Sequence, residues 1–158
     1  MVADDVAAFG CDVSDRLQTV LGSEFVAAYF VGSIALGGYV AGESDIDMVA
    51  VAERPIRDEL KHEIAEVLFD ATLHCPARGL EFTLYRNEVA ASAPRGADFE
   101  VNVNGGPRMT RVVHLDAGEQ PRFWYVLDRA IAHRHGIEVT GVQPVTCSPT
   151  LLDRRSST

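Results

Sequence analysis

The chain has 158 residues, which is enough for one domain with a single hydrophobic core and too few for two domains of ordinary size. Its 23 acidic and 14 basic residues give a formal net charge of −9, which argues against a nucleic-acid substrate and suits a cationic small molecule, although an acidic surface also simply keeps a protein soluble. No apolar run reaches transmembrane length and the N-terminus is acidic, so neither membrane insertion nor export is expected.

Cysteine usage gives a further constraint. Cys11, Cys75 and Cys147 are odd in number and share no metal-ligand spacing. This pattern indicates neither a disulfide framework nor a zinc site, and it favours a reducing cytoplasm.

The first predicted element is a helix that follows Asp4 and Asp5 and ends at Gly22. Apolar residues recur along one side of it at helical spacing from Val6 on, and the two acids complement the positive helix N-terminus. Residues 24–31 then form a predicted strand that is apolar on both faces. That habit is typical of a central strand covered on two sides.

A glycine-serine pair follows this strand, and two aspartates follow the pair after eleven residues. Gly32-Ser33 opens a short helical turn, and such a turn offers backbone N–H groups and a hydroxyl to a phosphate. Asp45 and Asp47 begin a second strand and share one of its faces, because side chains at i and i+2 point together. Neighbouring carboxylates repel one another unless a cation lies between them, and hard oxygen ligands suit Mg²⁺. We therefore expect phosphate and metal to meet here.

Downstream of the aspartates, a helix is predicted from Pro55 to about Leu73, with the proline at its first position. Residues 80–85 form the next strand, with Phe82 and Leu84 on one face and Glu81 on the other, beside Thr83 and Tyr85.

The last third of the chain contains weaker signals. Residues 87–97 read as a short helix or an irregular segment. Residues 98–104 alternate strictly and predict a half-exposed strand, whose polar face is either solvent surface or one wall of a substrate cleft. A further short strand is expected over residues 109–115, and a helix over residues 121–135 that stops at Gly136.

The spacing of Gly32-Ser33 and Asp45-Ile46-Asp47 resembles the signature of the nucleotidyltransferase superfamily that includes DNA polymerase β. The run GSIALGGYVAGESDIDMVAV is similar, more narrowly, to the aminoglycoside adenylyltransferases that modify streptomycin and spectinomycin. The resemblance runs from about Ala27 to about Pro144. It implies an α/β (α+β) nucleotidyltransferase fold, in which a mixed β-sheet has helices packed on one side and a carboxylate-lined active-site face.

The resemblance also implies roles for single residues. The expected catalytic residues and metal ligands are Asp45, Asp47 and Glu81, with Glu81 as the third carboxylate on a neighbouring strand and as base, ligand or both. The residues expected to contact the nucleotide are Gly32, Ser33, Gly37 and Ser44. The implied cofactor is Mg²⁺, and ATP is the implied co-substrate.

The implied reaction transfers AMP from ATP to a hydroxyl of a small cationic acceptor such as an aminoglycoside. An aromatic residue that several relatives carry after the polar strand is replaced here by Gly105-Gly106-Pro107, which leaves the acceptor open. An antitoxin-type nucleotidyltransferase that acts on a protein partner is one alternative, and an inactive nucleotide-binding remnant is another. A homodimer or a helical protein partner also stays open.

For the domain organisation, residues 1–144 are expected to form the catalytic domain, and the family's C-terminal helical domain has no counterpart in this sequence. The end of the sequence contains Pro144, Pro149 and a terminal Ser/Thr/Arg run and shows no helical stripe, so a disordered tail is expected over residues 145–158.

Overall fold

The computed structural model describes residues 2–91, 98–118 and 130–139. In these ranges a six-stranded sheet has the strand order β5-β4-β3-β2-β1-β6. The helices and strands, in chain order, are α1 (Asp4–Leu21), the 3₁₀ turn η1 (Gly22–Glu24), β1 (Phe25–Phe30), α2 (Gly32–Leu36), β2 (Ile46–Ala52), α3 (Asp58–Leu68), β3 (Leu80–Arg86), α4 (Asn87–Ala91), β4 (Val101–Gly106), β5 (Met109–His114) and β6 (Ile137–Val139).

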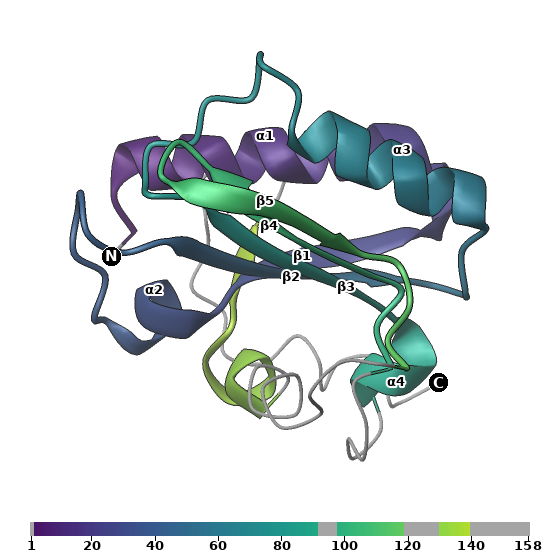
Figure 1. Cartoon of the computed structure of the whole chain (residues 1–158). Coiled ribbons are helices and arrows are strands. Elements are labelled where there is room, and N and C mark those ends of the chain that lie inside the picture. Colours follow the sequence, from purple (N-terminus) through teal and green to yellow (C-terminus); the bar gives the residue numbers. More distant parts are fainter. Residues whose placement is uncertain (1, 92–97, 119–129, 140–158) are drawn as a thin grey trace.

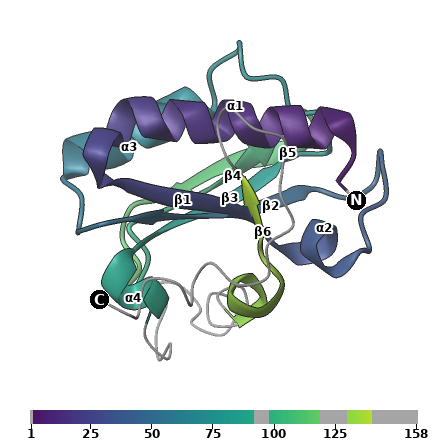
Figure 2. The ribbon, with the colours of Figure 1, turned by 180° about the vertical axis from the view of Figure 1, so that it is seen from behind.

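The sheet is mixed. Strands β2 and β3 are parallel, and every other neighbouring pair is antiparallel. Helix α3 lies between β2 and β3 in the chain and supplies the crossover that a parallel pair requires. The long helices α1 and α3 cover one face of the sheet, while α4 and the helical residues 130–135 lie on its other side (Figures 1 and 2). The predicted α/β fold, with a mixed sheet and its main helices on one side, is confirmed.

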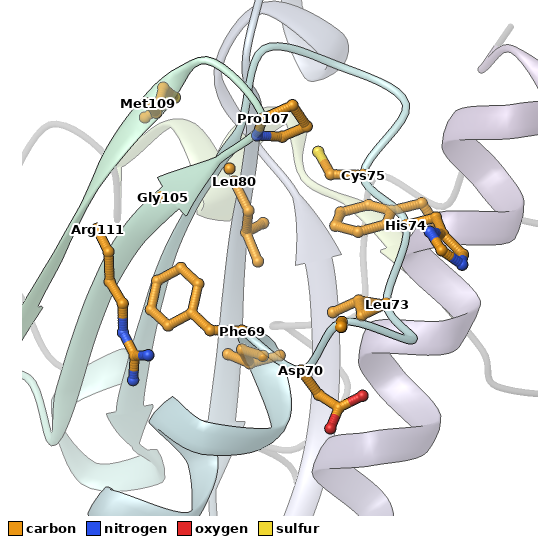
Figure 3. A pocket seen from close by; sticks show the side chains of 14 residues that line it. Phe69, Asp70, Leu73, His74, Cys75, Leu80, Gly105, Pro107, Met109 and Arg111 are labelled. Carbon is orange, nitrogen blue, oxygen red and sulfur yellow. The ribbon is translucent and has the colours of Figure 1, made fainter.

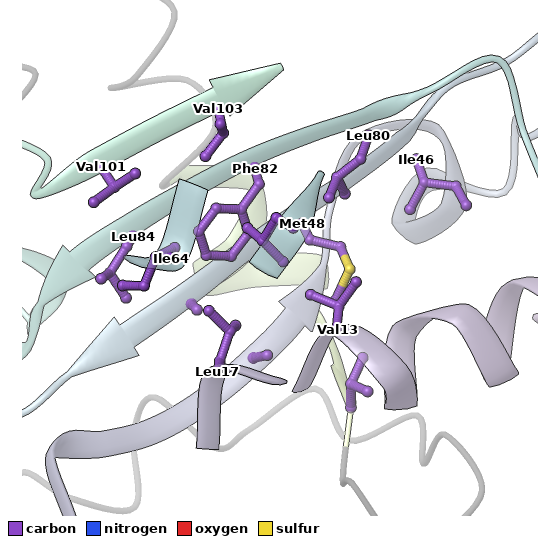
Figure 4. Close-up of a cluster of buried hydrophobic side chains, with 14 of the residues drawn as sticks. Val13, Leu17, Ile46, Met48, Ile64, Leu80, Phe82, Leu84, Val101 and Val103 are labelled. Atoms are coloured by element: carbon purple, nitrogen blue, oxygen red, sulfur yellow. The ribbon is translucent and has the colours of Figure 1, made fainter. Parts of the chain in front are cut away.

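The main core lies between the sheet and the two long helices. Leu17 of α1 and Ile64 of α3 meet Phe82 and Leu84 of β3 there, and all four side chains are fully buried (Figure 4). A smaller apolar cluster, which includes Tyr29 and Val49, covers part of the opposite face. Because β1 contributes side chains to both clusters, the prediction of a central strand covered on two sides is confirmed.

Helix α3 is shorter than its apolar pattern suggested. It begins at Asp58 and not at Pro55, because the backbone N–H of Ile56 donates to the buried carboxylate of Glu100 at 3.3 Å and holds the segment outside the helix. It ends at Leu68 and not near Leu73. There the carboxylate of Asp70 accepts the Thr72 N–H at 2.8 Å, a local turn that competes with further helix.

The strand predicted over residues 98–104 is shifted and is not half-exposed. It runs from Val101 to Gly106, and Glu100 and Asn102 are each only 5% exposed. Glu100 pairs with Lys61 and Arg86, so its charge is compensated away from bulk water. Asn102 hydrogen-bonds to the neighbouring strand β3. Two of the four residues on the predicted polar face, Glu100 and Asn102, are therefore interior, while Asn104 is half-buried and Asp98 is exposed.

Strand β6 is an element that the sequence did not predict. Its three residues pair with Ala28, Tyr29 and Phe30 at the β1 edge of the sheet. Such a short segment gives no periodic signal, and only the adjacent edge of β1 defines it as a strand. The helix predicted over residues 121–135 is seen at residues 130–135, and the rest of that helix lies outside the described residues, as does the tail predicted over residues 145–158. Within the described ranges, no helix combines the length and the apolar character needed to cross a membrane.

Candidate active site

Three carboxylates meet at one end of the sheet. Asp47 on β2 lies opposite Glu81 on β3 in the parallel register, and Asp45 immediately precedes β2. One carboxylate oxygen from each of Asp45, Asp47 and Glu81 lies within 4.8 Å of the other two. The structure thus brings the two aspartates of one predicted strand together with the glutamate of the next predicted strand.

Electrostatics at this cluster disfavour three free negative charges. Asp45 and Asp47 are half-buried, and Glu81 lies at the exposed side. Partial desolvation is the main cause that raises the pKa of the Glu81 carboxyl. The charge of Asp45 raises this pKa further, while hydrogen bonding with Asp47 and the charge of Arg78 act in the opposite direction. A proton or a cation at this position would relieve the repulsion.

Gly32 brings the start of α2 against the cluster. Its φ of +58° lies in the left-handed region, and a Cβ at this position would overlap the Oδ2 atom of Asp47. The preceding Val31 N–H donates to the backbone carbonyl of Asp47 at 2.9 Å, which fixes the two segments side by side. Glycine is therefore required here for two reasons, its backbone conformation and the close approach to a carboxylate.

Ser33 is the next residue of α2, and its hydroxyl oxygen is buried without a hydrogen-bond partner in the described part of the chain. Buried hydroxyl groups in folded proteins nearly always have a partner. An unsatisfied donor one residue from Gly32 is what a phosphate-binding position would show before its ligand arrives.

Gly37 and Ser44, the other two predicted nucleotide contacts, shape the connection between α2 and β2. Gly37 ends α2 with a φ of +78°, and its N–H donates to Ile34 at 3.4 Å. The Ser44 hydroxyl accepts the N–H of Val40 at 2.9 Å. Both residues have local partners, and a phosphate contact for either one stays a prediction.

The donor set fits a hard divalent cation. All three candidate ligands, Asp45, Asp47 and Glu81, provide carboxylate oxygens, which Mg²⁺ prefers, and the group contains neither the imidazole nor the thiolate typical of zinc sites. The cysteines Cys11 and Cys75 do not belong to this group.

Two polar residues beside the cluster were not singled out as site residues from the sequence. Asn104 on β4 lies opposite Glu81, and Asn102 lies opposite Thr83. The side-chain oxygens of both asparagines are buried without a hydrogen bond within the described residues. Their alternation in the sequence was a signal, but it could not reveal that this strand lies next to β3.

A cavity of about 420 Å³ lies on the other side of the sheet (Figure 3). Leu80 lines it, whereas Glu81, the next residue of β3, points to the opposite face. At its margin the Arg111 guanidinium stacks on the Phe69 ring at 4.4 Å and pairs with Glu66 at 3.0 Å. This cavity is therefore separate from the carboxylate cluster.

Among solved structures, the chain is similar to the crystal structure of spectinomycin adenyltransferase AAD(9) from Enterococcus faecialis, determined with ATP and spectinomycin. The sequence identity is 15% and the TM-score is 0.46, and the match covers 84% of this chain and 54% of that chain. The chain thus spans about half the length of that protein. No protein-family model and no curated protein matches the sequence.

Proposed function

We propose that the chain is a Mg²⁺-dependent nucleotidyltransferase that moves AMP from ATP to a hydroxyl of a small cationic acceptor such as an aminoglycoside. The observation that carries the proposal is the cluster of Asp45, Asp47 and Glu81, against which Gly32 is packed without room for a side chain. Phosphoryl-group transfer depends mainly on positioning and on compensation of negative charge, and these residues supply groups for both.

Each residue then has a distinct task. Asp45 and Asp47 would hold Mg²⁺, which when bound neutralises charge on the phosphate oxygens. The unpartnered hydroxyl of Ser33 would donate to a phosphate oxygen. Glu81, at the exposed side of the cluster, would take the proton of the acceptor hydroxyl. The hydroxyl oxygen then bonds to the α-phosphorus, the bond to the β-phosphate breaks, and pyrophosphate leaves.

The cationic acceptor is supported by charge. The chain carries a formal net charge of −9, and three of its carboxylates meet at the site. A positively charged acceptor would be attracted to this region, whereas an anionic acceptor would be repelled unless metal ions compensated it.

Transfer of label from α-labelled ATP to streptomycin, spectinomycin or related amines, with and without Mg²⁺, tests the proposal. We expect Asp45→Ala and Asp47→Asn to abolish Mg²⁺-dependent transfer, and Glu81→Gln to lower turnover by about 10²-fold or more while nucleotide binding persists, the scale of a lost general base. Asp58→Asn removes an acid from the first turn of α3 and serves as the matched control with normal activity. Full activity of Asp45→Ala would refute the assignment.

A further inference from the structure

A row of polar side chains continues from the carboxylate cluster across the sheet. In the antiparallel register of β3 and β4, Asn104 lies opposite Glu81, and Asn102 lies opposite Thr83. Directly opposed residues of neighbouring strands point to the same face, so Asp47, Glu81 and Asn104 form one row across three strands. Asn102 is 5% exposed and Asn104 is half-buried.

The Asn102 amide has a defined orientation. Its Nδ2 atom donates to the Phe82 carbonyl oxygen at 3.2 Å and to the Thr83 hydroxyl oxygen at 3.0 Å. Because a backbone carbonyl can only accept, the amide nitrogen has to face it and the amide oxygen has to face away. That oxygen is buried and receives no hydrogen bond within the described chain. Such an acceptor requires a donor that the described residues do not provide.

The Asn104 amide is less constrained. Its oxygen is likewise buried without a partner among the described residues, and no hydrogen bond there fixes the amide in one orientation. The side chain can therefore turn its carbonyl toward a molecule bound beside Glu81, which is its cross-strand neighbour. Both asparagines thus offer acceptor oxygens on the β4 side of the carboxylates.

Donors and acceptors are divided across the site. Ser33, on the α2 side of Asp47, offers a hydroxyl that can donate to phosphate. The amide oxygens on the β4 side can only accept, and the phosphates of ATP offer no donors to them. Nucleotide phosphates would therefore bind on the α2 side, and a molecule with several hydrogen-bond donors would bind on the β4 side.

We propose that Asn104, together with Asn102 two residues before it on the same face of β4, forms the acceptor subsite and selects a molecule that carries hydroxyl or ammonium groups next to the hydroxyl that reacts. The inference rests on the proposed nucleotide transfer. Ammonium donors form the stronger, charge-assisted hydrogen bonds, and the nearby Glu81 carboxylate favours them further. Asn104 would thus determine which acceptor binds. Asn102, whose amide is held by β3, would present a second acceptor oxygen on the same face of β4.

Steady-state kinetics with streptomycin and spectinomycin, in which acceptor and ATP are varied independently, tests the subsite. Asn104→Leu keeps the size of the side chain and removes its amide, so we expect the KM for the acceptor to rise about fivefold to tenfold or more, as for a lost hydrogen bond, and the KM for ATP to stay unchanged. Asn104→Thr keeps an acceptor oxygen on the strand and should give an intermediate value. Calorimetric titration with streptomycin in the absence of nucleotide should show the same order.

Val112→Ala is the matched control. Val112 lies opposite Asn104 on β5 and has no polar side-chain atom, so its replacement should leave both KM values unchanged. If Asn104→Leu does not fold, as judged by its thermal unfolding, Asn104→Thr decides the comparison. An unchanged acceptor KM, or an equal rise for acceptor and ATP, would overturn the subsite while leaving the proposed transfer in place. Absence of transfer by the unmodified protein with every acceptor would overturn both.

Discussion

At the scale of single residues, Gly32 has both a left-handed backbone conformation and a close contact with a carboxylate of the candidate site. Its φ of +58° and its contact with the Asp47 carboxylate exclude any side chain, whereas Gly42 has a φ of +82° and open space around it. The two glycines therefore share a backbone requirement and differ in their surroundings. A comparison of alanine variants can separate the two effects.

We expect Gly32→Ala to lower the free energy of unfolding by about 1–3 kcal/mol. If the proposed nucleotide site is correct, Mg²⁺-ATP should raise the unfolding temperature of the unmodified protein, and Gly32→Ala should abolish that rise. Gly42→Ala should cost about 1 kcal/mol from backbone strain alone and keep that response. Chemical and thermal unfolding with and without Mg²⁺-ATP measures both quantities. A normal ligand response in Gly32→Ala would show that the close approach to Asp47 is not needed for binding.

At the scale of elements, the buried side chain of Glu100 contacts three segments of the fold. Its carboxylate lies 3.3 Å from Arg86 at the end of β3 and 3.6 Å from Lys61 of α3, and it accepts the N–H of Ile56 ahead of α3. The Glu100 side chain is 6% exposed, and the Lys61 side chain is 15% exposed. Such a pair is screened far less by solvent than a surface pair is.

Replacement of Glu100 by alanine should therefore destabilise the protein measurably. It leaves Lys61, Arg86 and the Ile56 N–H without their shared partner, and we expect a loss of about 1–3 kcal/mol in the free energy of unfolding by urea. Glu66→Ala is the matched control, because Glu66 and Arg111 pair at 3.0 Å with side chains that are 75% and 48% exposed. Surface pairs of this kind contribute about 0–1 kcal/mol. Equal losses in the two variants would contradict a structural role for the buried cluster.

At the scale of the whole molecule, the acidic charge should govern how a cationic acceptor is captured. Attraction between exposed charges is screened over about 10 Å at 0.1 M salt and about 3 Å at 1 M salt. With a net charge of −9, binding of streptomycin or spectinomycin should weaken as salt rises, mainly through slower association. Calorimetric titration at several salt concentrations checks this, with thermal unfolding at each concentration as the control for folding. If the affinity does not change with salt, long-range electrostatic attraction does not contribute to acceptor binding.

The sequence alone determined the parts of this protein that depend on local spacing. The helical period fixed α1, and the apolar run after it fixed β1 as a strand buried on both faces. The separation of Gly32-Ser33 from Asp45 and Asp47 indicated the candidate site, and strand alternation put Glu81 on the face opposite Phe82. These features could be predicted because each depends on the geometry of a few consecutive residues.

The tertiary structure decided everything that depends on which segments become neighbours. The placement of β4 beside β3 buried Asn102 and left Asn104 half-buried next to Glu81, where the alternating sequence pattern allowed either solvent surface or one wall of a cleft. The packing of these segments also placed β6 beside β1, and it placed Lys61 and Arg86 beside Glu100. Register and long-range pairing follow from how the whole core packs, and no local pattern encodes them. The carboxylates and Gly32-Ser33 could therefore be predicted from the sequence, whereas the positions of Asn102 and Asn104 beside β3 could not.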